Sequence, residues 1–342
     1  METTLFLKRI IPLRRLLLPL VVFIFLFPHS PLLAQSRDQE RRAQVDSMLS
    51  ARYYRNKGDI DTNFIRRPQT KWTITTRANL SGTRIEAEGV VESGEHFKSQ
   101  MTADMKSTLS LGVSYLGLSL NLSLNPSKMM GKYHDYELNF HSYGKRFGFD
   151  FIFQEAKNFT GWHDQDGMAR IDLPADMLNI KTLNINAHYV VNSRRFSYPA
   201  AFSQNYIQLQ SAGSLLLGLS FQGQKAELEG EHKSRLTMTN IGIGAGYGYN
   251  YVPGKGWLVH ISVLPTFIVR SITSMTFDDN RVPLDYHFPE VIITSRYAMV
   301  YQWSNKFAGF STVYNFTNIG NKERLSVHNQ KWRIQAFLGL RL

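Results

Sequence analysis

The chain has 342 residues, no cysteine, and a formal net charge of +12 from 39 Lys and Arg against 27 Asp and Glu. The lack of cysteine excludes a disulfide framework and a lipid-anchored lipoprotein. No run of Lys and Arg is interleaved with aromatic residues, so nucleic acid is not an expected partner. The positive charge instead favours anionic lipid headgroups or lipopolysaccharide as counter-charge.

Residues 1–34 have the pattern of a secretory signal peptide. A basic head containing Lys8 and Arg15 precedes an apolar run over 16–27, and Ala34 offers a cleavage point. The apolar run is shorter than the roughly 20 residues that a spanning helix needs, so a retained membrane anchor is the weaker alternative. We therefore exclude 1–34 from the fold.

Residues 35–68 are predicted to form a periplasmic N-terminal helix and a lead-in to the first strand. Val45, Met48, Leu49 and Tyr53 recur at helical spacing within a strongly charged stretch. Their apolar stripe is narrow, so we expect the helix to dock weakly or to lie free in the periplasm.

Residues 69–342 are predicted to form one β-barrel, because apolar and polar residues alternate with period two. The segment 332–342, for example, places Ile334 and Leu338 on one face and Arg333 on the other. Because the last strand of a barrel pairs with its first, 332–342 is predicted to pair with 72–80. The twelve predicted strands lie near 72–80, 109–113, 116–124, 136–140, 147–153, 183–191, 215–221, 241–251, 257–269, 291–301, 310–316 and 332–342.

The predicted connections alternate in length, which is typical of outer-membrane barrels with long loops outside. The short ones are Ser114-Tyr115, Tyr143–Lys145, Pro253–Gly256 and Ser304-Asn305, and the long ones are near 81–105, 125–132, 157–178, 223–235, 271–289 and 318–330. At 114–115 a bulge in one long strand is an alternative to a turn. A soluble β-sandwich would have strands of about 5–6 residues, and the segments here are longer. The predicted fold class is all-β: a transmembrane antiparallel up-and-down β-barrel of about 12 strands with a short N-terminal helix.

Four motifs resemble an uncharacterised barrel family. They are G-K-Y-H-D-Y-E-L (131–138), Y-G-K-R-F-G (143–148), R-F-S-Y-P-A-A-F (195–202) and Q-x-x-S-A-G-S-L (208–215). The chain from about Tyr54 onward is similar to domain of unknown function 4421, found in Bacteroides-like bacteria. The resemblance implies an outer-membrane barrel without an established activity, and it supplies no catalytic residues.

No constellation in the sequence predicts a catalytic centre, a metal site or a cofactor. A Ser/His/Asn phospholipase triad needs a serine beside a histidine, and His141, His188 and His260 have no compelling serine neighbour. The loop W-H-D-Q-D-G (162–167) lacks the remaining ligands of a calcium loop, so we interpret it as a solvated acidic loop.

Charged and titratable residues on the polar strand faces are the candidates for lining the lumen. They are Arg77, Glu137, His141, Asp150, His188, Arg270, Arg296 and Arg333. In a twelve-strand barrel these side chains can interlock, so a filled interior is favoured over an open pore. On the apolar face, Phe151→Arg is expected to cost roughly 2–4 kcal/mol, and Asp150 next to it is expected to tolerate replacement by Asn far better.

The connection 192–210 is long but falls on the side of the short turns. Its aromatic residues, which include Phe196, Tyr198 and Phe202, are too apolar for a free loop in water. We hypothesise a plug in the periplasmic mouth, in which Arg194 and Arg195 meet lumen carboxylates such as Glu137 or Asp150. A platform for a periplasmic partner, or a plain turn with extended strand ends, are the alternatives.

The sequence thus predicts a barrel in the outer membrane of a Gram-negative bacterium. Its expected role is non-enzymatic, either as a narrow passage for small polar solutes or as an envelope scaffold. A lipid-active hydrolase is the alternative. The expected partners are outer-membrane lipids and lipopolysaccharide, the barrel-assembly machinery and, through 192–210, a periplasmic protein.

Overall fold

The structure is a computed structural model. It describes residues 35–54, 59–90, 94–116, 118–124, 136–175, 177–228, 234–254, 256–277, 280–284, 290–321 and 325–342. The predicted signal peptide lies outside the described residues, as does the connection 125–132.

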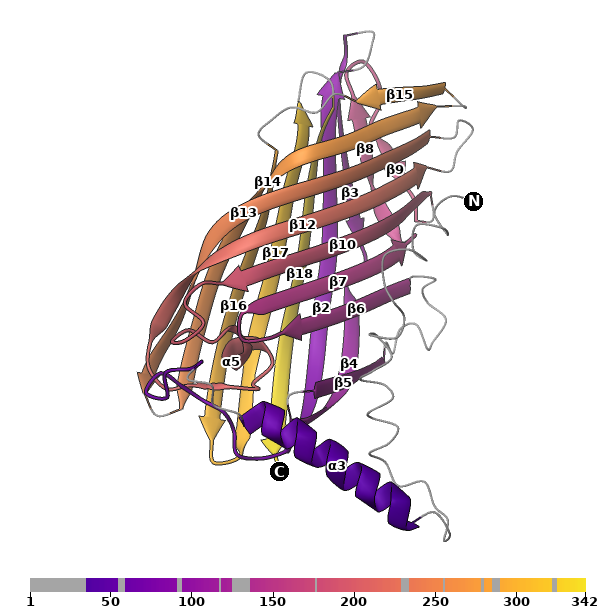
Figure 1. Ribbon diagram of the computed structural model, residues 1–342. Helices are drawn as coiled ribbons and strands as arrows, with labels where there is room; N and C mark the ends of the chain where they lie inside the picture. The colour runs from indigo at the N-terminus through magenta and orange to yellow at the C-terminus, as the bar shows by residue number, and fades with distance from the viewer. Residues whose placement is uncertain are drawn as a thin grey trace.

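The predicted N-terminal helix is present as α3 (Gln35–Tyr54), and it lies at one end of a curled sheet (Figure 1). The helix contacts the barrel through its last turn and through an ion pair of 2.8 Å between Asp46 and Lys71. Burial raises the pKa of Tyr53 to about 12, so its hydroxyl remains protonated and donates to the carbonyl oxygen of Asn205 over 3.2 Å. None of the described helices is long and apolar enough to cross a membrane.

Twelve antiparallel strands of the described chain form the wall, and each of them pairs with the next one along the wall. In order of pairing they are β6 (Tyr136–Tyr143), β7 (Phe147–Ala156), β10 (Leu178–Val190), β12 (Ala212–Leu228), β13 (Ser234–Gly254), β14 (Trp257–Phe277), β16 (Val291–Trp303), β17 (Lys306–Asn321), β18 (Leu325–Arg341), β2 (Trp72–Val90), β4 (Lys106–Tyr115) and β5 (Leu118–Leu124). The predicted up-and-down topology is therefore confirmed.

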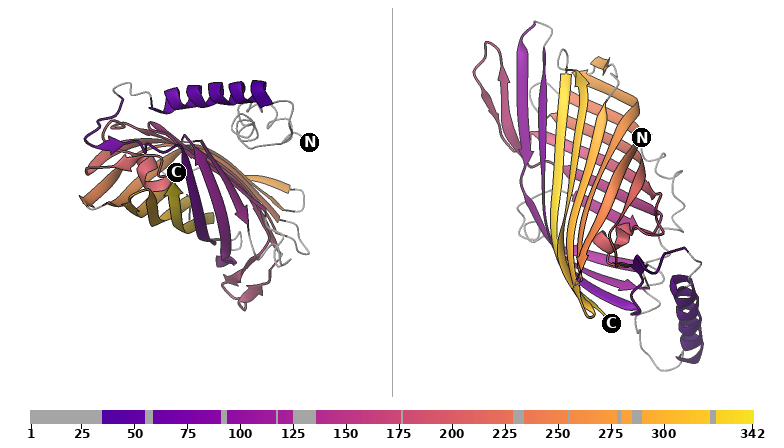
Figure 2. Two further views of the ribbon diagram at one scale, coloured as in Figure 1. Left: turned by 90° about the horizontal axis from the view of Figure 1, so that it is seen from below. Right: turned by 90° about the vertical axis from the view of Figure 1, so that its left-hand side faces the viewer.

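The closing contact of the barrel is also confirmed. Strand β18 pairs with β2 along its whole length, with Ile334 opposite Leu80 and Arg341 opposite Thr73. Between β5 and β6 no pairing is present in the described residues, so these strands are the two edges of one strongly curled sheet (Figure 2). The segment that joins β5 to β6 lies outside the described residues.

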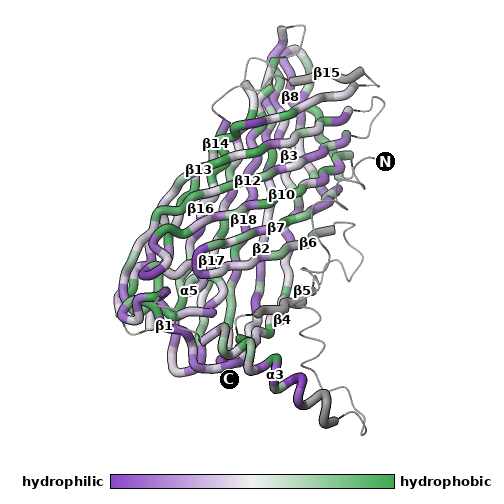
Figure 3. The backbone as a smooth tube through the Cα atoms, viewed as in Figure 1, coloured by the Kyte–Doolittle hydropathy of each residue, from purple (hydrophilic) through white to green (hydrophobic). Residues whose placement is uncertain are grey.

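The two faces of the sheet differ as the period-two pattern predicts. Outward side chains are apolar and exposed, among them Phe147, Leu217, Leu219, Ile243, Tyr247, Ile261, Phe310 and Leu338. Inward side chains are polar and buried, among them Asp150, His188, Ser220, Gln222, Asn250, His260, Ser262 and Arg296. Hydrophobic and hydrophilic residues are interspersed along the strands of the wall in Figure 3, as in a transmembrane barrel with a lipid-facing belt and a polar interior.

The short turns mark one end of the barrel, which we call the turn end; the opposite one is the loop end. Aromatic residues gather on the outside of the turn end. The Trp257 and Tyr301 ring centroids are 4.7 Å apart, and those of Tyr301 and Trp303 are 5.4 Å apart. This arrangement suits an interfacial aromatic girdle.

The first hairpin turns later than predicted. Tyr115 pairs with Leu118 and Leu109 with Leu124, so neither a turn at 114–115 nor a bulge there is correct. Leu116 lies in the turn with a φ of 47°, a left-handed conformation that most residues avoid. Ser114 and Tyr115 continue the strand, because their backbone groups pair with Thr73 and Trp72 of β2.

Most predicted long loops are extensions of the strands. The stretch 81–105 is the upper half of β2 followed by β3 (His96–Ala103), and β3 pairs with β8 (Phe159–Gln165), which pairs with β9 (Ile171–Leu173). A further short strand, β15 (Asn280–Leu284), pairs with β14. Beyond a lipid belt both faces of a strand meet water, so the apolar alternation that reveals a strand in the sequence is lost.

Candidate functional site

The connection 192–210 lies inside the turn end rather than outside it. It contains α5 (Tyr198–Phe202), which sits within the curve of the sheet in Figures 1 and 2. The side chain of Ser197 caps this short helix by accepting from the Ala200 N–H over 3.3 Å, and Pro199 occupies its first turn. Phe196, Tyr198, Ala200 and Ala201 have no exposed surface, so we call 192–210 the plug segment.

Inward-facing apolar residues of the wall form the socket for the plug segment. Phe196 and Tyr198 pack against Val190, Leu216 and Leu264. Ala200 and Ala201 pack against a second group, which comprises Leu258, Ala298, Val300, Phe307 and Phe337. Such residues would be costly in a water-filled lumen, and covering them stabilises the plug segment in place.

The lead-in from the N-terminus clamps the plug segment from below. Strand β1 (Ile65–Arg66) pairs with β11 (Ile207–Gln208), and the Asp61 N–H donates to the Arg194 carbonyl over 2.9 Å. The guanidinium of Arg195 lies 3.2 Å from the Asp61 carboxylate. The hypothesis that these arginines meet lumen carboxylates is therefore wrong for Arg195, whose partner is Asp61. Both Arg194 and Arg195 are exposed, whereas Phe196 and Tyr198 are buried.

Two buried amides hold the plug segment to the wall. The Gln208 side-chain oxygen accepts from the Ser197 N–H and from the Asn250 amide, each over 2.9 Å. The Gln208 nitrogen donates to the Arg195 carbonyl over 2.6 Å. Asn250 in β13 donates again to the Ser197 carbonyl over 2.9 Å. Every polar group of this buried junction thus has a partner, as a water-excluded interface requires.

His260 continues the junction along β14, and it does have a serine neighbour. Its Nδ1 lies 2.7 Å from Asn250 Oδ1 and its Nε2 lies 3.0 Å from Ser262 Oγ. Because the Asn250 nitrogen is used elsewhere, Oδ1 accepts, so His260 carries its proton on Nδ1 and accepts from Ser262. The expectation that no histidine has a fitting serine partner is wrong for this pair. Both residues lie on one strand two positions apart, and so share the inward face.

This Ser-His-Asn connectivity is that of a nucleophile, a base and an orienting group. The rings of Tyr198 and Phe202 cover His260, with centroids 5.1 Å and 5.0 Å away. His260 and Ser262 are only 1 % and 3 % exposed. The plug segment thus covers Ser262, and hydrogen bonds join Asn250 and Ser262 to the plug at Ser197 and Tyr198.

Tyr198 links the plug to a buried ion pair in the wall. Its hydroxyl lies 3.4 Å from Ser262 Oγ and accepts from the Arg296 guanidinium over 3.0 Å. Burial raises the pKa of Tyr198, so the phenol remains protonated and can donate to Ser262. Arg296 of β16 in turn donates to Asp150 of β7, and both side chains are buried. Because Arg296 and Asp150 come from different walls, the pair ties them across the lumen.

The other oxygen of Asp150 organises β6 and β18. It accepts from His141 Nδ1 and from the Tyr143 hydroxyl, each over 2.6 Å. His141 Nε2 accepts from the Arg333 guanidinium over 2.8 Å, which requires the neutral tautomer protonated on Nδ1. One hydrogen-bonded network, which we call the lumen lock, thus runs from Gln208 through Asn250, His260, Ser262, Tyr198, Arg296, Asp150 and His141 to Arg333.

The remaining lumen candidates lie apart from the lumen lock or only beside it. The His188 ring packs against Tyr198 in a tilted arrangement with centroids 4.5 Å apart, and it lies over Gly148, where any Cβ would collide with it. Arg77 is half-buried on the inward face of β2, opposite Phe337. Glu137 pairs with Gln154 in the backbone register of β6 and β7, and its side chain lies outside the described part of the structure.

Arg270 does not line the lumen, contrary to expectation. In the ladder between β13 and β14, Ile241 is opposite Arg270 and Gly242 is opposite Ile268, so Val269 forms a β-bulge. The bulge reverses the alternation that follows it. Ile268 is fully buried inside, whereas Arg270 is exposed on the outer face.

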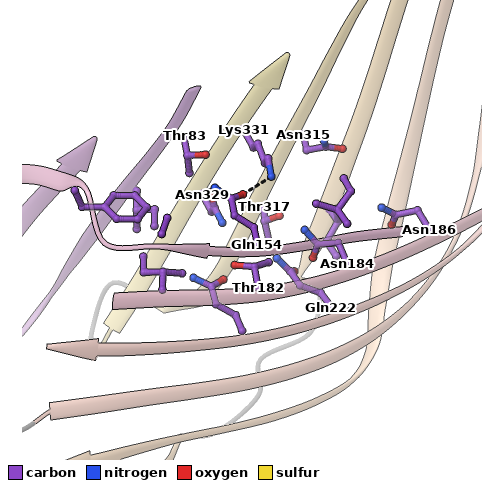
Figure 4. Close-up of a pocket in the computed structure, with 17 residues that line it drawn as sticks. Thr83, Gln154, Thr182, Asn184, Asn186, Gln222, Asn315, Thr317, Asn329 and Lys331 are labelled. Atoms are coloured by element: carbon purple, nitrogen blue, oxygen red, sulfur yellow. Dashed lines mark hydrogen bonds between the residues drawn. The ribbon is translucent and has the colours of Figure 1, made fainter. Parts of the chain in front are cut away.

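On the loop-end side of the lumen lock the lumen opens into a small cavity of about 50 Å³, which is continuous with solvent. Its walls come from β7, β10 and β12 on one side and from β16, β17, β18 and β2 on the other (Figure 4). Lys331 donates to Gln154 Oε1 over 2.5 Å between the two walls. Seven side-chain amides and three threonines face this cavity, and the described residues that line it include no carboxylate. We call it the amide cavity.

Metal binding has no support in the described residues, where no group of three or more His, Asp or Glu side chains is placed to hold an ion. Residues 162–167, the acidic stretch, fall on β8 and the turn after it. His163 Nδ1 lies 2.8 Å from Ser99 Oγ on the neighbouring strand β3. That contact is a cross-strand hydrogen bond.

The fold and site together define an up-and-down transmembrane β-barrel whose turn end is filled by a segment of its own chain. The chain belongs to the family described as Domain of unknown function (DUF4421), whose profile matches residues 59–341. No curated protein is a significant match to this chain.

Three solved outer-membrane proteins are similar to this chain at low sequence identity. The outer membrane protease OmpT of Escherichia coli has a TM-score of 0.42 at 8 % identity, covering 81 % of this chain and 98 % of that protein. For the outer membrane protein OprG of Pseudomonas aeruginosa the TM-score is 0.27 at 11 % identity, with 80 % and 96 % covered. The P. putida toluene transporter TodX has a TM-score of 0.26 at 8 % identity, with 80 % and 91 % covered. None of these similarities carries an activity to this chain.

Proposed function

We propose that the protein spans the outer membrane with its turn end in the periplasm. The exposed apolar belt supports this placement, because an outward face of Leu, Ile and Phe side chains is unfavourable in water and favourable in lipid. The aromatic residues at the turn end suit one lipid–water boundary. Anionic lipid headgroups and lipopolysaccharide are then natural surroundings for the basic chain, and the barrel-assembly machinery is the proposed route of insertion.

Replacing Leu219 with Arg is expected to lower the free energy of unfolding by roughly 2–4 kcal/mol, because the side chain would face the middle of the belt. Leu219 is 55 % exposed. Met168 is 59 % exposed but lies at the loop end, so Met168→Arg is a matched control and should have little effect. Both are measured by urea unfolding in lipid vesicles. Equal stability of the two variants would contradict the assignment of the belt to lipid.

We further propose a non-enzymatic role, as a narrow passage for small polar solutes that the plug segment closes at the periplasmic end. One observation carries this proposal. Phe196, Tyr198, Ala200 and Ala201 of the plug segment are buried in an apolar socket at one end of the lumen, whereas the other end opens into the amide cavity. A pure scaffold needs no polar cavity, and an open porin needs no seated plug.

Replacing residues 193–203 with a short Gly-Ser turn tests the passage. The change removes α5 and should raise the single-channel conductance of the purified protein in planar bilayers. Replacement of 162–172, which has the same length and lies at the loop end, is the control and should leave conductance unchanged. If the barrel stays folded without its plug segment but its conductance does not rise, the passage is excluded and the envelope scaffold remains as the role.

The absence of cysteine allows a second test without deletion. Ala201→Cys introduces one thiol at a position with no exposed surface. A membrane-impermeant thiol reagent should not modify it while the plug is seated, whereas Leu209→Cys on the exposed edge of the segment should react at once. Equal labelling of the two thiols would show that the segment is not seated.

A lipid-active hydrolase is the second candidate, and the connectivity of Ser262, His260 and Asn250 is the observation in its favour. Their burial under the plug segment is the observation against it. A serine-reactive fluorophosphonate probe separates the two. No labelling is expected in the intact protein, and labelling of Ser262 after removal of residues 193–203 would favour the hydrolase.

A further inference from the structure

Four cations from three separate segments meet at the rim of the turn end. They are Arg67 of the lead-in, Lys145 and Arg146 of the turn between β6 and β7, and Arg194 near the start of the plug segment. Burial lowers the pKa of Lys145, and the carboxylate of Asp59 acts in the opposite direction. The charges of all three arginines lower this pKa as well, so they lie close enough to Lys145 to repel it. We call the four cations the rim cluster.

The rim cluster carries more positive charge than its surroundings neutralise. The Asp59 carboxylate lies 3.8 Å from the Lys145 ammonium. Asp61, the next acid along the chain, is engaged by an arginine outside the cluster. Arg146 and Arg194 are exposed, and neither forms an ion pair within the described part of the chain. Like charges gathered without sufficient counter-charge repel one another, so the rim cluster favours the binding of an anion.

The rim cluster borders directly on the apolar outer face of the wall. Phe147, the residue after Arg146, is 69 % exposed. The Val190 N–H donates to the Arg146 carbonyl over 2.7 Å, which holds the end of β10 beside the turn. Val191, the next residue, is 50 % exposed and precedes Arg194 by three positions. An anion at the cluster therefore lies beside an apolar surface that acyl chains can cover.

An anionic phospholipid fits both features with one molecule. Its phosphate accepts paired hydrogen bonds from a guanidinium, and its acyl chains pack on the apolar face. A zwitterionic phospholipid carries an ammonium or a quaternary amine in its headgroup, which the cluster repels. An acidic protein segment would supply the charge and leave the apolar face uncovered. Clusters of Lys and Arg at a membrane boundary are a known means of selecting anionic lipids.

We propose that the rim cluster is a binding site for an anionic phospholipid of the membrane leaflet at the turn end. This inference rests on the proposed placement of the barrel in a membrane, and it adds the lipid class and the residues that hold it. Arg146 and Arg194 would donate to the phosphate, and Lys145 and Arg67 would add positive potential from less exposed positions. The site requires neither an open lumen nor a movable plug segment.

Native mass spectrometry of the purified full chain in a nonionic detergent tests the site. Phosphatidylglycerol and phosphatidylcholine with the same acyl chains are titrated separately, so that the contribution of the chains cancels in the ratio of the two affinities. Phosphatidylglycerol is expected to bind about tenfold more tightly, a ratio that corresponds to about 1.4 kcal/mol. The double variant Arg146→Gln, Arg194→Gln should reduce the ratio to about one. Should that variant fail to fold, Arg146→Gln alone should reduce it by about threefold.

The double variant Arg170→Gln, Arg235→Gln is the matched control, because it removes the same charge from two exposed arginines at the loop end. It should keep the preference for phosphatidylglycerol. No preference in the unmodified protein would overturn the site, as would an equal loss in the two double variants or no loss in either. Displacement of phosphatidylglycerol by poly-L-glutamate at equal charge concentration would assign the cluster to an acidic protein and also overturn it.

Failure of the lipid site and failure of the proposed placement give different results. Thr62→Cys puts one thiol on the exposed lead-in at the turn end of a chain that has no cysteine. In intact cells a membrane-impermeant thiol reagent should reach it only after the outer membrane is opened. Labelling before opening would overturn the periplasmic placement, and the lipid preference measured in detergent would stand. Protection of the thiol without any lipid preference would overturn the lipid site alone.

Discussion

Replacing Arg296 with Met is expected to lower the free energy of unfolding by about 3–5 kcal/mol. Arg296 and Asp150 are 5 % and 3 % exposed, so the substitution would leave the Asp150 carboxylate buried without its counter-charge. It would also remove the hydrogen bond from Arg296 to Tyr198, which holds the plug segment. Methionine keeps the length and most of the volume, so the effect reports mainly the charge. Urea unfolding in lipid vesicles measures it.

Two further variants show whether burial is the cause. Arg195→Met breaks the pair with Asp61, in which the arginine side chain is 58 % exposed, and should cost only about 0–1 kcal/mol. The double variant Asp150→Asn, Arg296→Met removes both charges and should recover much of the stability lost by Arg296→Met alone. If Arg296→Met is no more costly than Arg195→Met, the lumen lock does not stabilise the barrel.

For Asp150 the structure adds a prediction that the sequence did not give. From the sequence, Asp150 is an ordinary polar lumen residue, expected to tolerate Asn far better than Phe151 tolerates Arg. In the structure it accepts from Arg296, His141 and Tyr143 together. An amide provides one oxygen where the carboxylate uses two, so Asp150→Asn alone should destabilise the barrel. The period-two alternation along a strand predicts that a side chain faces the lumen. It does not predict which side chains on the opposite wall that side chain contacts.

The architecture of the wall was predictable because apolar and polar residues alternate with period two along each strand. The pairing of 332–342 with 72–80 followed from closure, and the structure shows it. Alternation fails as a guide where the backbone departs from a regular ladder. The bulge at Val269 turned Arg270 outward, and the left-handed Leu116 moved the first turn by two residues along the strand. Neither residue is one that normally marks a bulge or a turn.

The site was predictable only in part. Aromatic residues in 192–210 indicated a buried segment, but the partner of Arg195 is Asp61, about 130 residues earlier in the chain. One signal in the sequence was missed. Leu216, Leu258 and Phe337 occupy inward positions at the turn end, where a water-filled lumen would require polar residues. Strands that are apolar on both faces over their last turn-end residues indicate that something covers the inner face.

The amide cavity could not be found from the sequence. Gln222, Asn315 and Asn329 are ordinary inward residues of separate strands, and only the curl of the sheet brings them to one cavity. Nothing in the spacing along a strand shows that an amide oxygen has no donor. An amide oxygen without a donor is recognised only when the hydrogen-bond partners of every side chain in the lumen are known from the structure.

Removing residues 337–342 is expected to abolish assembly of the barrel. These residues pair with β17 on one side and with β2 on the other, so their loss exposes two strand edges at once. They also complete the plug socket, since Phe337 packs on Phe307 and the Arg341 guanidinium donates to the Gln204 carbonyl over 3.2 Å. The truncated chain should be degraded, with no protein in the membrane fraction that resists unfolding in cold detergent.

Two point variants separate the pairing of the strand from its packing. Leu338→Ala changes an exposed side chain and keeps every backbone bond, so assembly should be normal. Phe337→Ala opens a void beneath the plug segment and should cost about 3–5 kcal/mol while the closing ladder remains. If assembly needs only the ladder, Phe337→Ala reaches the membrane and unfolds at lower urea. Normal yield of the chain without 337–342 would contradict closure through β18 and β2, because no other described strand is placed to pair with the edge of β2.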